Sequence, residues 1–149
     1  MHTNIFTQAA CVIMLCMMGS SSAADKTSVP LAPCPDSPNC VSSLAPASDR
    51  THYIAPLGFS GDPAVAWQRL KTAVLAEKRV TVLVERKDYL HAEIRSLIFR
   101  FVDDVEFSLD AGAGLINVRS ASRMGYSDFG VNRKRVERIR TAFDSQADK

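Results

Sequence analysis

The segment Tyr89–Arg95, which reads Tyr-Leu-His-Ala-Glu-Ile-Arg, decides the fold, because apolar and polar side chains alternate along it. Every second residue from Leu90 to Ile94 is apolar, and the residues between them are polar or charged. A period of two is the pattern of a β-strand with one buried face. We therefore expect a strand whose apolar side packs on a core.

Three neighbouring segments show the same alternation: residues 80–85, 101–109 and 116–121. Lys87 and Asp88 supply the turn between the first two strands, and residues 112–114 supply a hairpin loop before the last. Residues 96–100 hold no turn residues and are interpreted as a bulged corner. Consecutive hairpins predict an antiparallel sheet.

A strand and two helices complete the pattern. Residues 53–57 are interpreted as an edge strand, because Pro56 has no N–H for a central ladder. One helix is expected to begin with Asp62 as N-cap and to bury Trp67, and the other to cover residues 132–145. The sequence predicts an α+β fold: an antiparallel sheet of about five strands with two helices on one face, in the order β-α-β-β-β-β-α.

The closing helix begins with a run of basic residues. Asn132 is a suitable N-cap, which places Arg133, Lys134 and Arg135 in the first turn. Each cation there is disfavoured by about 0.3–1 kcal/mol, because the N-terminus of a helix carries partial positive charge. An anion is therefore expected nearby, either an internal carboxylate or a bound phosphate or carboxylate.

The N-terminus has the organisation of a secretory signal peptide over residues 1–24. Residues 9–18 are uncharged and apolar, and small residues follow up to Ala24. This run is too short for a permanent membrane span. We expect cleavage near Ala24 and a periplasmic or secreted protein, with a lipid anchor on Cys16 as the alternative.

Cleavage would leave an irregular segment over residues 25–50 and one α+β domain over residues 51–149. The formal net charge stays at +2, because residues 1–24 hold no Asp, Glu, Lys or Arg. Nucleic-acid binding is not expected of a nearly neutral, exported protein. Cys34 and Cys40 are expected to form a structural disulfide, with a redox pair as the minor alternative. No metal or cofactor is expected.

Asp103 is the unusual carboxylate of the sheet, because it falls on the apolar side. It needs a partner there, and Arg100, Arg123 and Arg135 are the candidates. The polar face is either a solvated surface with ion pairs or a binding surface. No catalytic residue is assigned, because enzyme motifs are weak, and a hydrolase would have to use His91 with a serine.

Four motifs carry a resemblance to a known family: CPDSPNCVSS at residues 34–43, YLHAEIRS at 89–96, FVDDVEF at 101–107 and RSASRMGYSDFGVNRKRV at 119–136. They resemble an uncharacterised family of bacteria and plastids, domain of unknown function 1499. The resemblance covers nearly all of the mature chain and implies no particular reaction. It singles out the cysteine pair, the acidic residues Asp103 and Asp104, and the basic and hydroxyl residues around the closing helix.

The candidate ligand-binding cluster comprises Arg95, Arg119, Ser120, Ser122, Arg123, Ser127, Asp128, Asn132, Arg133 and Arg135, with Asp103 and Asp104 as structural acidic partners. Our first hypothesis is a non-enzymatic exported module that binds a small anionic molecule, a lipid or an envelope component at this cluster. The alternative is a structural or protein-interaction domain in which the same residues form an internal salt-bridge network. An envelope hydrolase is the third hypothesis.

Overall fold

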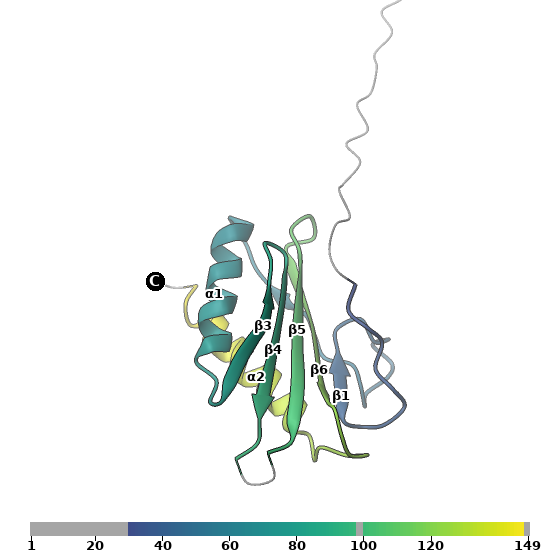
Figure 1. The fold of residues 1–149 in the computed structure, drawn as a ribbon. Coiled ribbons are helices and arrows are strands. Elements are labelled where there is room, and N and C mark those ends of the chain that lie inside the picture. The colour runs from purple at the N-terminus through teal and green to yellow at the C-terminus, as the bar shows by residue number, and fades with distance from the viewer. Residues whose placement is uncertain (1–29, 98–99, 148–149) are drawn as a thin grey trace, which may run out of the picture.

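The computed structural model describes residues 30–97 and 100–147, which form an antiparallel sheet with both helices on one face (Figure 1). The strands are β1 (Cys40–Ser42), β2 (Leu57–Gly58), β3 (Val80–Glu85), β4 (Tyr89–Arg95), β5 (Val102–Asp110) and β6 (Leu115–Ser122), and the helices are α1 (Pro63–Leu75) and α2 (Val131–Asp144). The strand order is β1-β6-β5-β4-β3, and β2 also pairs with β6. The predicted α+β class, with two helices on one side of an antiparallel sheet, is confirmed.

One hydrophobic core fills the space between the sheet and the helices. The alternating residues of β4 to β6 face it, and Phe107 and Ile116 are fully buried there. Leu70 of α1 and Phe143 of α2 close it from the other side. The sole tryptophan, Trp67, belongs to this core, and its indole N–H donates to the carbonyl of Arg86 at 3.1 Å.

Helix α1 begins where its capping residues predict. The side chain of Asp62 accepts a hydrogen bond from the backbone N–H of Ala64 at 2.8 Å, and Pro63 is the first helical residue. This arrangement satisfies one of the free N–H groups at the helix start, and proline has no N–H to leave unpaired. The predicted start of this helix is confirmed.

The N-terminal edge of the sheet differs from the prediction. Residues 25–50 are not wholly irregular, because Cys40–Ser42 form β1 and pair with β6. The edge strand expected at residues 53–57 is reduced to β2, Leu57–Gly58. A strand of three residues holds too few alternations to show a period in the sequence. The predicted signal peptide and Cys16 lie outside the described residues, and so does part of the predicted corner at 96–100.

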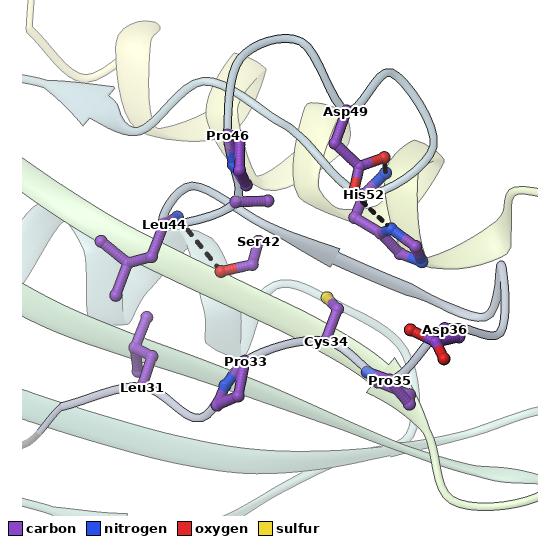
Figure 2. A pocket seen from close by; sticks show the side chains of 11 residues that line it. Leu31, Pro33, Cys34, Pro35, Asp36, Ser42, Leu44, Pro46, Asp49 and His52 are labelled. Atoms are coloured by element: carbon purple, nitrogen blue, oxygen red, sulfur yellow. Dashed lines mark hydrogen bonds and ion pairs between the residues drawn. The ribbon is translucent and has the colours of Figure 1, made fainter.

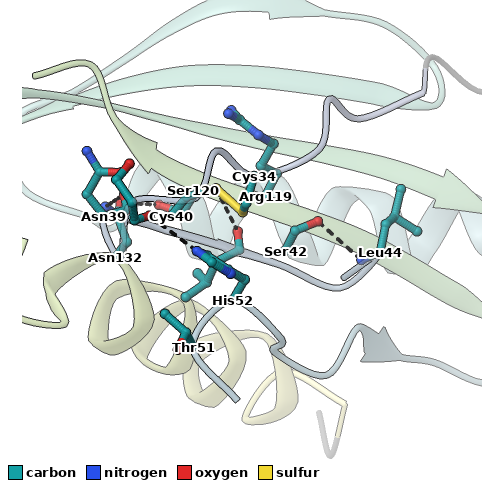
Figure 3. The surroundings of a disulfide bond; sticks show 12 residues. Cys34, Asn39, Cys40, Ser42, Leu44, Thr51, His52, Arg119, Ser120 and Asn132 are labelled. Atoms are coloured by element: carbon teal, nitrogen blue, oxygen red, sulfur yellow. Dashed lines mark hydrogen bonds between the residues drawn. A yellow bond between two sulfur atoms is a disulfide. The ribbon is translucent and has the colours of Figure 1, made fainter. Parts of the chain in front are cut away.

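The expected disulfide joins Cys34 to Cys40, whose Cα atoms are 5.7 Å apart (Figure 3). His52 ties the same segment from the other side. Its Nδ1 lies 2.7 Å from Oδ2 of Asp49, and its Nε2 lies 3.2 Å from the carbonyl oxygen of Ser37 (Figure 2 shows the Asp49 contact). Both partners are acceptors, so both bonds require the doubly protonated imidazolium. The hydrogen bond to Asp49 raises the pKa of His52 above its ordinary value.

The His52 contact predicts a pH-dependent stability. Because the pKa is raised in the folded state, the stabilisation is complete below the unfolded value of about 6.5 and is lost as the pH rises through the raised pKa. We expect the difference in melting temperature between the wild type and His52→Gln to shrink over this interval. Asp49→Asn should abolish the pH dependence of that difference. A difference that stays constant with pH would contradict the interpretation.

Candidate functional site

A buried ion pair joins the sheet to α2. Asp103 lies on the core face of β5, and its Oδ2 is 2.5 Å from Nη2 of Arg135. The two side chains are only 6% and 4% exposed, respectively. A carboxylate in a core is costly unless a cation is paired with it. Arg135, one of the three candidate partners, is the arginine that Asp103 requires.

Asn132 organises the polar residues around this pair. Its Oδ1 accepts from Oγ of Ser120 and from Nη1 of Arg135, both at 2.6 Å. Its Nδ2 donates to the carbonyl of Asn39 at 3.0 Å and to Oγ of Ser122 at 3.1 Å. These four bonds use the full capacity of an asparagine side chain. The fully buried amide therefore ties α2 to β6 and to the segment before β1 (Figure 3).

The expectation that Asn132 is the N-cap of α2 is wrong. Gly130, with φ of 75°, precedes the first helical residue, Val131. The carboxylate of Asp128 accepts from the backbone N–H of Gly130 at 2.9 Å and of Asn132 at 2.6 Å. Glycine adopts this left-handed conformation without steric cost, so the chain turns into the helix earlier than expected. The helix N-terminus thus has an internal carboxylate, which is one of the two kinds of anion expected there.

The other cations at the start of α2 differ in their surroundings. Arg133 donates through Nη2 to the carbonyl oxygens of Arg50 at 3.3 Å and Thr51 at 3.0 Å. Lys134 is exposed to solvent. The basic run therefore has two kinds of internal acceptor, the Asp103 carboxylate for Arg135 and backbone carbonyls for Arg133.

The remaining arginines of the predicted cluster lie on the opposite face of the sheet. Arg123 contacts Oδ1 of Asp104 at 2.8 Å and Oε1 of Glu93 at 2.5 Å. Two further pairs at 3.1 Å flank it: Arg95 with Glu93, and Arg119 with Glu106. Burial opposes ionisation of Asp104, but hydrogen bonds from Arg123 and His91 outweigh it and lower its pKa below the ordinary value.

His91 also lies on this outer face, where its Nε2 is 2.7 Å from Oδ1 of Asp104. Strand pairing places His91 opposite Glu106, on the side away from the core. Ser120 and Ser122 bond to Asn132 on the core side. The sheet therefore separates His91 from Ser120 and Ser122.

Two cavities are lined by residues of the connections from β4 to β5 and from β6 to α2. These connections lie at the lower end of the sheet in Figure 1. One cavity, of about 520 Å³, has apolar walls, and we call it the apolar cavity. Its walls include Leu97, Phe101, Met124, Phe129 and Val131. Its polar lining includes Asp103, Ser122, Ser127 and Asp128.

The second cavity, of about 600 Å³, is lined largely by basic residues, and we call it the basic groove. Its charged lining consists of Lys78, Arg79, Arg95, Arg135, Arg138 and one acid, Glu77. Ser96, Leu97 and Val131 line both cavities. Because Arg135 lines the groove and its partner Asp103 lines the apolar cavity, the buried ion pair separates the two spaces.

Strained backbone gathers at the same end of the fold. Among the described residues, the non-glycine residues with positive φ are Arg79 at 58°, Arg100 at 53° and Phe129 at 54°. Arg79 lines the basic groove, Phe129 lines the apolar cavity, and Arg100 precedes a third lining residue, Phe101. Left-handed backbone in such residues costs free energy and is typically found at functional sites.

A further cavity of about 300 Å³ lies between the segment around Cys34 and the loop that ends at His52 (Figure 2). Both ring nitrogens of His52 already have partners, so this residue offers no free acid–base group to a ligand. Sequence reasoning missed His52, and it also missed Asn39. The signal for Asn39 was its place directly before Cys40, which the disulfide and β1 hold in position.

A comparison with protein families matches residues 30–143 to the family described as "Protein of unknown function (DUF1499)". No curated protein matches the chain. Over residues 30–97 and 100–147, no helix is long and apolar enough to cross a membrane. Within the same ranges, no three His, Cys, Asp or Glu side chains gather as a metal site.

Replacing Asp103 by asparagine should test the buried pair. Asp103→Asn leaves Arg135 as a buried charge without its counter-ion, so we expect the free energy of unfolding in urea to fall by about 3–5 kcal/mol. Glu85→Gln is the control, because it removes an ion pair with Lys71 in which Glu85 is 48% exposed. Exposed pairs contribute about 0–1 kcal/mol. An Asp103→Asn variant as stable as Glu85→Gln would contradict this account.

Proposed function

Because the chain belongs to the DUF1499 family, whose description states no activity, we propose a function from the geometry of its own site. The domain is a non-enzymatic, exported module that binds a small anionic ligand in the basic groove. The observation that carries this proposal is the charge of the groove, which is lined by five basic residues and one acidic residue, Glu77. The disulfide supports the exported half of the proposal, because such bonds persist in oxidising compartments.

The groove keeps a positive excess after its ion pairs are taken into account. Arg138 is paired with Glu77 at 2.7 Å, and Arg135 is paired with Asp103. Arg95 is paired with Glu93 on the outer face of the sheet. Lys78 and Arg79 make no ion pair with a described residue, although Nε of Arg79 donates to the carbonyl of Arg95 at 2.7 Å. Lys78 and the remaining guanidinium N–H groups of Arg79 are therefore the donors that an entering anion would contact.

Lysine and arginine side by side suit phosphate or carboxylate. Arginine offers a planar fork of N–H donors, and lysine supplies a mobile point charge. The left-handed backbone at Arg79 turns the chain between α1 and β3, so that both side chains line the groove. Arg135 lies beside them in a fixed orientation, because Asn132 and Asp103 hold its guanidinium.

One alternative has an observation in its favour. Arg119, Arg123 and Arg135 each have an internal carboxylate partner, which is what a structural or protein-interaction domain with an internal salt-bridge network requires. That alternative needs no ligand. Anion binding at Lys78 and Arg79 would distinguish the two hypotheses, because these two residues make no ion pair in the internal salt-bridge network.

Titration with inorganic phosphate tests the proposal. We expect phosphate to raise the melting temperature of the domain, and Lys78→Gln to weaken phosphate binding roughly fivefold, as expected for one lost charged donor. Lys134→Gln is the matched control, since it removes the same charge from an exposed position that lines neither cavity. Equal losses in both variants, or no stabilisation by phosphate, would favour the structural alternative.

A further inference from the structure

We propose that the ligand is a single-chain amphiphile, a molecule with one anionic head group and one linear hydrocarbon chain. The head group lies in the basic groove, and the chain lies in the apolar cavity. This inference rests on the proposed anion binding and extends it to the class of ligand. Free fatty acids and single-chain phospholipids share this chemistry.

The two cavities adjoin one another, which is the first ground for the inference. Ser96, Leu97 and Val131 line both of them, so a molecule seated in the groove reaches the apolar cavity across Leu97 and Val131. Their volumes of about 600 and 520 Å³ both fall in the range of about 300–1,000 Å³ that small-molecule sites occupy. One elongated molecule can therefore occupy both spaces.

The exposed apolar side chains around the second cavity are the next ground. Leu97 is 72% exposed, Met124 75% and Phe129 89%, and all three line the apolar cavity. Large apolar side chains scattered singly need no explanation, but a group of them around one cavity marks a binding surface. A hydrocarbon chain would remove this surface from water.

The conformation of Phe129 is difficult to explain by folding alone. Its φ of 54° is costly for an aromatic residue, and its exposed ring gains little packing in return. The turn is held by hydrogen bonds from Phe129 N–H to Oγ of Ser127 at 3.3 Å and from Gly130 N–H to Asp128. These contacts fix the backbone so that the ring forms a wall of the apolar cavity.

Charge determines which end of the ligand lies in which cavity. The charged residues that line the apolar cavity are the carboxylates of Asp103 and Asp128, which disfavour an anionic head group. The groove has the opposite charge, with an excess of lysine and arginine. An amphiphile with a neutral or cationic head group would gain nothing from the groove, so this polarity favours an anionic head.

Calorimetric titration with ethyl, butyl, hexyl and octyl phosphate, each below its micelle concentration, tests the inference. We expect the dissociation constant to fall about fourfold for each methylene added until the chain fills the cavity. Inorganic phosphate should bind more weakly than any of them. Octanol, which has the chain without the anion, should bind much more weakly than octyl phosphate.

The double variant Met124→Gln/Phe129→Asn should flatten the chain-length series and leave the affinity for inorganic phosphate unchanged. Asparagine tolerates the left-handed backbone at position 129, so the turn is preserved. Leu83→Gln is the control, because Leu83 is 46% exposed on β3 and lines neither cavity. It should leave the series as steep as in the wild type.

The possible outcomes distinguish amphiphile binding from simple anion binding. If inorganic phosphate binds but the affinity does not rise with chain length, the amphiphile inference fails and anion binding stands. If octanol binds as tightly as octyl phosphate, the head-group assignment fails. If inorganic phosphate does not bind and Lys78→Gln binds octyl phosphate like the wild type, both proposals fail.

Discussion

The buried ion pair between Asp103 and Arg135 is the constraint on which one end of this fold depends. It joins the central strand β5 to the first turns of α2 in a place where both side chains are almost fully buried. Such a pair is tolerated only when both side chains are held in the correct orientation. Asn132 helps to hold them, because its amide oxygen accepts hydrogen bonds from Arg135 and from the hydroxyl of Ser120.

The same ion pair borders both surface cavities. Asp103 lines the apolar cavity and Arg135 lines the basic groove, so the position of α2 determines the shape of both spaces. Residues that form one cluster in the sequence are divided by the sheet into an inner and an outer set. Only the inner set borders the apolar cavity. On the outer face, Arg119 and Arg123 are paired with carboxylates of neighbouring strands.

The strands β3 to β6 and the start of α1 were predictable from short stretches of sequence. The strands show alternating apolar and polar residues, and the helix start shows a capping aspartate followed by proline. The need of Asp103 for an arginine was also predictable, since a carboxylate at an apolar position requires a cation. The strand β1 was missed because three residues are too few to show an alternation of apolar and polar side chains. The cap of α2 was misassigned because Asn132 suits that role by residue type, whereas the left-handed conformation of Gly130 starts the helix at Val131. The cavities were not predictable, because their walls come from connections far apart in the chain.

The most direct test of the account is a crystal structure of the domain with octyl phosphate bound. The phosphate should lie within hydrogen-bonding distance of Lys78 or Arg79, and the hydrocarbon chain should lie against Met124 and Phe129. In that structure Asp128 should still accept hydrogen bonds from the backbone N–H groups of Gly130 and Asn132, and Asp103 should still contact Arg135. A phosphate at the N-terminus of α2 in place of Asp128, or a chain bound on the outer face of the sheet, would contradict it.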